Sequence, residues 1–573
     1  MNSSRRRYPI ILLAVLCIIP VTGVTQAADE TLTVETIVRE LDFDDQLPSE
    51  VEWLPETDRF SYIAPDTNSG ETALWVENAT TGDRKPLLTS DETTWTTDDD
   101  TLRISMKNYT WLPDESGLVL RARGDLWYYK IEDEILERLT DTSAGEEQVT
   151  VAPNSKFAGF VRENDLWAIR LKSGKEYRLT TTGSKTMLNG KLDWVYQEEL
   201  VGRGFFRAYW WSSDSKYLAY LQFDESPVPE YPLVDWIPYH PDLELQHYPK
   251  AGDHNPVVRL GVVRLQNKPA TIWMDTGEET DVYFPRVYWV PGQKQLVFMR
   301  LDRAQEHLDF LIADTRNGNS EVILEESDPH WINILSDVEM LSSGESFVWG
   351  SERSGYRHLY RYDHDGSLMN EITSGGWMVT ELVSVDEERD WVYFAGTKDG
   401  IRERNLYRVK LDGSGLEQLS DRPGFHDVKM AASGNYYLDW YSDLKTPEQI
   451  NLHLSTGAKL RTVASPDTAG LDEYQLSEPE LFTFKGTNDL TYHASIIRPS
   501  DFDPATRYPV IVYVYGGPHV QIVQQEYGGR RQLFHQMLAQ KGYIVFSMDN
   551  RGSWARGHDW ESAVDQNLGA TEL

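Results

Sequence analysis

The sequence predicts a β-propeller, most simply of eight blades, followed by an incomplete α/β domain. Two patterns along the 573 residues support this fold class. Between residues 51 and 470, a short apolar strand, a turn of Pro, Asp, Ser or Gly and a second apolar strand recur many times. After residue 470 the pattern becomes strand, glycine-rich loop, helix and strand, which is typical of α/β domains. The chain also contains 19 Trp and 30 Tyr, and aromatic residues favour β-structure.

The repeated hairpin is the unit from which a propeller blade is built. Its copies recur at irregular intervals of about 40 to 80 residues, and several add a third strand ending in Leu-Trp or Leu-Tyr. Radial repetition leaves few open strand edges, so a propeller fits better than the alternative, an irregular array of β-sandwiches. The eight copies span residues 51–63, 109–129, 149–171, 209–224, 287–301, 340–366, 383–409 and 430–442.

Residues 471–573 predict the start of a different domain. The stretch 480–502 is typical of two strands, and the continuous apolar run at 508–515 predicts a strand buried on both faces. Residues 531–553 then predict a helix followed by another buried strand. The next helix is expected over 562–573, where the sequence stops. A parallel sheet with only its first strands would leave apolar edges uncovered, so we expect this domain to be incomplete.

The N-terminus has the features of an export signal. Arg5, Arg6 and Arg7 precede the apolar run 8–23, and small residues follow near Ala27, so residues 1–27 are predicted to be a signal peptide. An uncleaved membrane anchor is the alternative. Cys17, the single cysteine, lies inside this run, so the mature chain would have no thiol or disulfide. Residues 28–50 form an N-terminal segment before the propeller. We expect an exported protein, most simply a periplasmic one.

Charge and motif content exclude several classes of function. The net charge of −36 argues against nucleic-acid binding, because a phosphate backbone attracts a basic surface. The histidines show no H-E-x-x-H or similar spacing, and no phosphate loop or haem motif occurs. The sequence therefore predicts no metal and no cofactor.

The stretch DWVYQEELVGRGFF (193–206) carries the first candidate site, the adjacent Glu198 and Glu199. Asp193 can cap a helix and Gly202 can end it, so residues 194–201 predict about two helical turns. On a helix, neighbouring carboxylates lie close enough to converge on one ligand. Two carboxylates in a partly desolvated site need a cation, or one of them must take up a proton. A peptide's α-ammonium is such a cation; the simpler alternative is a solvated helix face.

Five stretches together resemble the dipeptidyl peptidase IV family, serine exopeptidases of the prolyl oligopeptidase clan. The resemblance covers essentially the whole mature chain in the same order, and its type is bacterial. The stretches are DWVYQEE (193–199), YWWSSDSKYLAY (209–220), YPKAGDHNP (248–256), YPVIVYVYGGPHVQ (508–521) and DNRGSWARGHDWE (549–561).

The resemblance implies roles for three residues. Glu198 and Glu199 would hold the substrate's N-terminal ammonium, which restricts cleavage to the second peptide bond. Tyr515, at the end of the strand 508–515, would help to stabilise the tetrahedral oxyanion. The implied fold of residues 471–573 is the start of an α/β-hydrolase domain. The implied partners are peptides with a free N-terminus, with Xaa-Pro or Xaa-Ala as the released dipeptide, and a full-length chain could form a homodimer.

The sequence departs from the family at the nucleophile. The family's catalytic serine lies in G-x-S-x-G, and this motif is absent from the 573 residues. We therefore expect the chain as given to lack the Ser-Asp-His triad and to be inactive. The alternative interpretation is a non-catalytic exported propeller that binds peptide N-termini or a protein partner.

Overall fold

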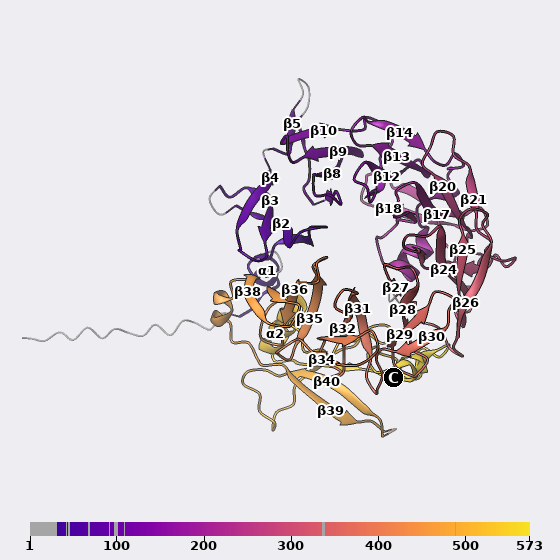
Figure 1. The fold of residues 1–573 in the computed structure, drawn as a ribbon. Coiled ribbons are helices and arrows are strands. Elements are labelled where there is room, and N and C mark those ends of the chain that lie inside the picture. The colour runs from indigo at the N-terminus through magenta and orange to yellow at the C-terminus, as the bar shows by residue number, and fades with distance from the viewer. Residues whose placement is uncertain are drawn as a thin grey trace, which may run out of the picture.

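The computed structural model describes residues 31–572, except for residues 42, 44–45, 67–68, 91, 97–100, 108, 335–337 and 488. Its larger part is a ring of eight antiparallel sheets (Figure 1). Each sheet is one blade made from one continuous stretch of chain, so the described residues confirm the predicted eight-bladed propeller. The predicted signal peptide (1–27) and Cys17 lie outside the described residues.

The first four blades run from residue 49 to residue 273. Blade 1 contains β1 (Ser49–Trp53), β2 (Arg59–Pro65), β3 (Thr72–Asn78) and β4 (Arg84–Thr89), and blade 2 contains β7 (Tyr109–Trp111), β8 (Gly117–Ala122), β9 (Asp125–Lys130) and β10 (Ile135–Arg138). Blade 3 contains β11 (Glu147–Val151), β12 (Phe157–Arg162), β13 (Asp165–Arg170) and β14 (Lys175–Arg178). Blade 4 contains β15 (Met187–Asn189), β16 (Tyr209–Trp211), β17 (Tyr217–Asp224), β20 (Val257–Arg264) and β21 (Thr271–Trp273). Two further hairpins, β5 (Thr94–Thr96) with β6 (Thr101–Arg103) and β18 (Glu230–Asp235) with β19 (Asp242–His247), extend from this half.

The second four blades complete the ring. Blade 5 contains β22 (Val282–Tyr283), β23 (Val287–Trp289), β24 (Gln295–Asp302), β25 (His307–Asp314) and β26 (Ser320–Ser327). Blade 6 contains β27 (Val338–Met340), β28 (Ser346–Ser351), β29 (His358–Asp363) and β30 (Leu368–Glu371). Blade 7 contains β31 (Val379–Asp386), β32 (Trp391–Gly396), β33 (Asn405–Lys410) and β34 (Glu417–Gln418), and blade 8 contains β35 (Phe425–Met430), β36 (Tyr436–Ser442), β37 (Gln449–Leu454) and β38 (Lys459–Ala464).

The repeated turn of the sequence closes the first hairpin of successive blades in the same way. In blades 1, 2 and 3, the residue after the first strand donates its backbone N–H across the turn to the carbonyl at the start of the next strand. These bonds are Leu54 to Arg59 (2.8 Å), Leu112 to Gly117 (3.0 Å) and Ala152 to Phe157 (2.8 Å). The Pro/Asp/Ser/Gly turn therefore sets the spacing of the strands on either side.

Side chains, not a shared sheet, close the ring between blade 8 and blade 1. A common core contains Phe60 and Tyr62 of blade 1 together with Leu438 and Ile450 of blade 8. At its rim, the indole N–H of Trp53 donates to the backbone carbonyl of Lys429 at 2.8 Å. Because each blade is contiguous in sequence, this closure depends on packing of the first blade against the last.

The C-terminal segment forms a four-stranded sheet in the order β39 (Glu480–Lys485), β40 (Thr491–Ile497), β42 (Ile544–Asp549) and β41 (Val510–Tyr513). β41 and β42 are parallel, and α2 (Gly529–Gln540) connects them. The C-terminal part of the chain also contains the short helices η3 (Ala469–Glu473), α3 (His558–Glu561) and η4 (Ser562–Val564). The N-terminal helix α1 (Val34–Arg39) packs on α2, where Ile37 meets Leu533 in a small core. The two ends of the described chain thus share one α/β unit.

This α/β unit lies against blades 6, 7 and 8 (Figure 1). The buried Arg404 of blade 7 donates to the side-chain carbonyl of Gln521 at 2.7 Å. His558 N–H donates to the carbonyl of Gly355 in blade 6 at 2.9 Å. Tyr527 N–H donates to Ser442 Oγ of blade 8 at 3.3 Å. The loops on either side of α2 are therefore fixed relative to the propeller.

Two predictions about the C-terminal segment are wrong. The strand expected to be buried on both faces, β41, is exposed, with Val510 at 52% and Val512 at 60%. Its only strand partner in the described part of the chain is β42, and α2 packs on β42 and β40 instead. Of the helix expected over residues 562–573, the described part to residue 572 does not form, because η4 ends at Val564 and turns follow. Among the described residues, no helix has the length and apolar character needed to cross a membrane.

Candidate functional site

The helix that carries the glutamate pair is a π-helix, η2 (Tyr196–Val201), which continues a short helical start at residues 194–195. The prediction of an ordinary α-helix over 194–201 is therefore wrong in type but right in position. Asp193 caps it as expected, accepting from Tyr196 N–H at 3.0 Å, and Gly202 ends it. The Tyr196 hydroxyl is completely buried and accepts from Phe284 N–H at 2.8 Å. Single π-helical turns of this kind often occur at functional sites.

The π-helix directs its apolar side chains inward and the glutamates outward. Glu198 is partly covered, with 17% of its side chain exposed, whereas Glu199 is exposed. Glu198 already has a cationic partner, because Arg203 Nε donates to Glu198 Oε1 at 2.8 Å. Arg203 itself is 82% exposed. Glu199 forms no ion pair with any residue that the structure describes, so it is the carboxylate available to a ligand.

Two buried acids, Asp193 and Glu225, interact with each other near the start of this helix. Burial raises the pKa of Asp193 to about 6. Burial, followed by the nearby charge of Asp193, raises the pKa of Glu225 to about 7. Because burial favours the protonated form of both acids, their negative charge near neutral pH is reduced, and Glu198 and Glu199 are the main source of negative charge on η2.

Tyr515, the candidate oxyanion donor, lies two residues beyond the end of β41 and is 59% exposed. Gly516 follows it with φ of +84°, a backbone conformation that suits glycine. A Cβ at position 517 would lie 3.2 Å from Tyr515 Cε1, so Gly517 allows the loop to pass close to the ring. Tyr513, in contrast, packs against the neighbouring helix, with its ring 5.2 Å from that of His535.

The loop that begins at Tyr515 carries His519, whose charge interacts with Glu199. His519 lies four residues later, and its Nδ1 is 3.0 Å from Glu561 Oε1. The hydrogen bond to Glu561 is the largest cause that raises the pKa of His519, and Glu199 adds a smaller attraction. The structure thus brings Glu199 near this loop. It places no direct contact between Tyr515 and either glutamate within the described residues.

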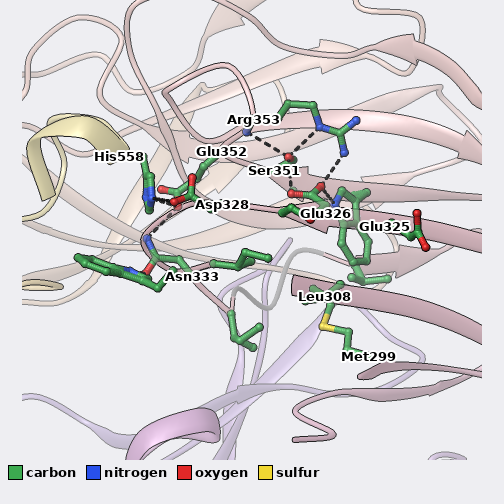
Figure 2. A pocket seen from close by; sticks show the side chains of 17 residues that line it. Met299, Leu308, Glu325, Glu326, Asp328, Asn333, Ser351, Glu352, Arg353 and His558 are labelled. Atoms are coloured by element: carbon green, nitrogen blue, oxygen red, sulfur yellow. Dashed lines mark hydrogen bonds and ion pairs between the residues drawn. The ribbon is translucent and has the colours of Figure 1, made fainter. Parts of the chain in front are cut away.

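A polar cavity of about 260 Å³ adjoins this loop between blades 5 and 6 and α3 (Figure 2). Figure 2 shows His558 between the carboxylates of Asp328 and Glu352, with one ring nitrogen 3.1 Å from each. Burial opposes the charged imidazole, but the two carboxylates outweigh it and raise the pKa of His558 to about 9. Asn333 donates to Glu352 and to Glu561 at 2.8 and 3.0 Å.

Sequence reasoning did not find Arg203 or the residues of this cavity. Arg203 lies within the quoted stretch 193–206, so its spacing of five from Glu198 was a usable signal. Asn333, Glu352 and His558 come from distant parts of the chain, and no local pattern marks them as neighbours.

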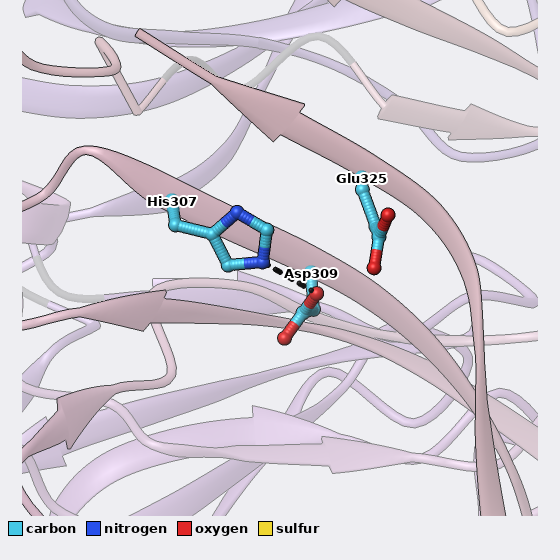
Figure 3. A group of neighbouring side chains, drawn as sticks. All are labelled: His307, Asp309 and Glu325. Carbon is cyan, nitrogen blue, oxygen red and sulfur yellow. Dashed lines mark hydrogen bonds and ion pairs between the residues drawn. The ribbon is translucent and has the colours of Figure 1, made fainter. Parts of the chain in front are cut away.

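Within the part of the chain that the structure describes, two groups of side chains have the composition of a metal site. One is His307, Asp309 and Glu325 on neighbouring strands of blade 5 (Figure 3), and the other is Glu352, His558 and Glu561. In the first group, Arg300 Nε donates to Asp309 at 3.0 Å and already neutralises that carboxylate.

Comparison with known proteins decides the family. The model of the dipeptidyl peptidase IV (DPP IV) N-terminal region matches residues 120–448, which is more than half of the chain. The chain belongs to the dipeptidyl peptidase IV family. The prolyl oligopeptidase family model matches residues 532–573, the end of the α/β segment. The family of peptidase hydrolases predicted from the five motif stretches is therefore confirmed.

Individual relatives agree with this assignment. The chain is 28% identical to dipeptidyl peptidase 4 of Trichophyton rubrum over 91% of this chain and 69% of that protein. It is 29% identical to dipeptidyl peptidase 4 of Arthroderma otae, with the same two coverages. The crystal structure of Porphyromonas gingivalis dipeptidyl peptidase 4 superposes with a TM-score of 0.85 at 25% identity, covering 95% of this chain and 77% of that one. The match to the Porphyromonas gingivalis structure covers 95% of this chain and so includes both the propeller and the C-terminal α/β segment.

Proposed function

We propose that this protein is by family a serine-type dipeptidyl peptidase for Xaa-Pro or Xaa-Ala peptide N-termini, and that residues 1–573 bind such a substrate but lack the Ser-Asp-His triad that would cleave it. The observation that carries the proposal is the pair Glu198 and Glu199, held outward on a firmly anchored π-helix with Glu199 unpaired among the described residues. With Arg203 included, the three formal charges sum to −1, which suits one ammonium group. An endopeptidase would have no use for a site that binds a terminal charge.

The proposal gives each named residue a separate role. Glu199, with Glu198 beside it, accepts hydrogen bonds from the substrate α-ammonium and fixes the register of the peptide. Tyr515 donates its hydroxyl to the oxyanion that develops at the second residue's carbonyl. No G-x-S-x-G occurs in residues 1–573, so the proposal assigns no nucleophile, acid or catalytic histidine within them. As given, the chain would bind substrate without cleaving it.

The proposed setting follows from the N-terminal sequence. The basic and apolar stretch within residues 1–27 supports export, with the periplasm as the destination and an N-terminal anchor as the alternative. The partners are peptides with free N-termini, and a homodimer is proposed only for a full-length chain. No cofactor enters the proposal.

Calorimetric titration with matched peptides tests this function. We expect Ala-Pro-Ala-Ala to bind and its N-acetylated form to bind at least tenfold more weakly, because acetylation removes the charge. Equal binding of both peptides would contradict the proposed site. Release of p-nitroaniline from Ala-Pro-p-nitroanilide by this chain would contradict the assignment of binding without cleavage. Binding without any turnover would also be the behaviour of the alternative, a non-catalytic propeller that captures peptide N-termini.

A further inference from the structure

We propose that Glu352, His558 and Glu561 bind one divalent transition-metal ion, with Zn²⁺ the best fit, where the α/β segment meets blade 6. Glu352 follows β28, and His558 and Glu561 are the first and last residues of α3. Their spacing of three places the two α3 side chains on one face. One ligand atom from each residue lies within 4.8 Å of the other two. Figure 2 shows His558 facing the carboxylate of Glu352.

The distances are close to those that a bound ion needs. Zinc binds imidazole nitrogen and carboxylate oxygen at about 2.0 to 2.2 Å, so tetrahedral ligand atoms are about 3.3 Å apart. His558 Nδ1 and Glu352 Oε2 are 3.1 Å apart. A metal ion could therefore enter between them with small side-chain shifts. One imidazole with carboxylates is also a ligand set that first-row transition metals accept.

His558 provides a second, independent observation. The residue is only 5% exposed, yet neither ring nitrogen makes a hydrogen bond of acceptable geometry with any described residue. Nδ1 points toward Glu352, and Nε2 lies 3.1 Å from Asp328 Oδ1. Buried polar nitrogens are rarely left in this state. A metal at Nδ1 would replace the proton that the neighbouring carboxylates stabilise on the ring, and Asp328 would then orient the ring through Nε2, as carboxylates commonly do behind metal-binding histidines.

The neighbouring contacts orient the two carboxylate ligands. Asn333 Nδ2 donates to Glu352 and Glu561, while Asn333 Oδ1 accepts from Trp331 at 2.9 Å. The backbone N–H of His519 donates to Glu561 Oε1 at 2.8 Å. Among the described residues the cationic partners of these glutamates are histidines, His519 at Glu561 and His558 at Glu352, and no Lys or Arg pairs with either. This distinguishes the site from His307, Asp309 and Glu325, where Arg300 occupies the central carboxylate.

The cavity beside His558 offers a route to the site. Its volume is about 260 Å³, and its lining includes Asp328, Glu352 and His558. A metal held there would link α3 to blade 6 through one ligand from the propeller and two from the α/β segment. The inferred role is therefore structural, and it does not depend on peptide binding at Glu199.

Zinc titration of the tag-free chain of 573 residues tests the inference. After dialysis against EDTA and removal of the chelator, we expect one Zn²⁺ per chain by calorimetry and by elemental analysis after gel filtration. His558→Gln and Glu561→Gln should abolish this binding. His307→Gln is the matched control and should retain it, because it changes the other histidine–carboxylate group. Asp328→Asn should weaken binding by about 10- to 100-fold.

Several results would overturn the site. The site is contradicted if the unmodified chain does not retain zinc. It is also contradicted if His558→Gln binds zinc as the unmodified chain does, because that result would indicate adventitious surface binding only. If circular dichroism shows that His558→Gln does not fold, the zinc ligands are identified instead from the zinc-edge X-ray absorption spectrum of the unmodified chain. One imidazole with oxygen ligands supports the site, whereas no imidazole, or more than one, contradicts it.

Discussion

Replacing Glu199 with Gln should weaken the binding of a free peptide N-terminus by about 5- to 30-fold. The variant keeps the size and shape of the side chain but removes its charge. Glu199 is exposed and forms no ion pair with a described residue, whereas Glu198 is held by Arg203. The lost interaction is consequently a single contact between the ammonium and one carboxylate.

The magnitude follows from the exposure of this contact. A hydrogen bond to a charged group contributes about 1.5 to 3 kcal/mol when well formed, and an exposed ion pair about 0.2 to 1 kcal/mol. Glu199 is exposed in the free protein but lies near the loop that carries His519. A value of about 1 to 2 kcal/mol runs from the top of the exposed-pair range into the lower part of the charged-hydrogen-bond range, and it corresponds to the stated change in Kd.

Arg203→Gln should act in the opposite direction and tighten binding by about 2- to 5-fold. The formal charge of the three residues changes from −1 to −2, because the variant removes the cation that pairs with Glu198. An exposed pair is worth at most about 1 kcal/mol, which limits the gain. Both effects should shrink as ionic strength rises.

Calorimetry with Ala-Pro-Ala-Ala at two salt concentrations measures both variants. Glu321→Gln is the control, because Glu321 is an exposed glutamate on the outer strand β26 of blade 5. Its Kd should equal that of the unmodified chain. Unchanged binding in Glu199→Gln, or weaker binding in Arg203→Gln, would refute the electrostatic reasoning.

Three further changes test the scaffold. Asp193→Ala should cost about 0.5 to 2 kcal/mol in urea unfolding and weaken peptide binding, because it removes the helix cap, while Asp193→Asn should retain both. Burial lowers the pKa of His493 to about 4, so the unfolded chain binds a proton first as pH falls below 6.5. The free energy of unfolding should therefore decrease from pH 6.5 toward pH 4, with a slope that corresponds to the uptake of at most one proton on unfolding. His493→Asn should reduce this slope, and an unchanged slope in the variant would contradict the prediction. Leu438→Ala, in the core that closes the ring, should destabilise the chain by about 2 to 5 kcal/mol, and a change below about 1 kcal/mol would count against that closure.

The propeller could be predicted from sequence because its signals are local. Each turn lies within a few residues of the strands it joins, as in the bond from Leu112 N–H to the Gly117 carbonyl. The same holds for the cap at Asp193. Blade closure and the packing of α1 on α2 were not predicted, because Phe60 with Leu438, and Ile37 with Leu533, are hundreds of residues apart.

The errors have physical causes as well. The apolar run at 508–515 indicated a buried strand, but apolar composition does not specify which elements cover it, and Val512 is exposed. The π-helix differs from an α-helix in its backbone hydrogen bonding, and its Tyr196 is anchored by Phe284, a contact remote in sequence. Glu198 and Glu199 were chosen correctly as neighbours on one helix, but their unequal exposure required the structure.

The most direct measurement is a crystal structure of this chain with Ala-Pro-Ala-Ala bound. The account predicts that the peptide's α-amino nitrogen lies within about 3.2 Å of a Glu199 carboxylate oxygen. It also predicts the Tyr515 hydroxyl on the side of the second residue's carbonyl. An α-amino nitrogen bound elsewhere, such as in the cavity beside Asp328 and Glu352, would contradict the assignment of the glutamate pair.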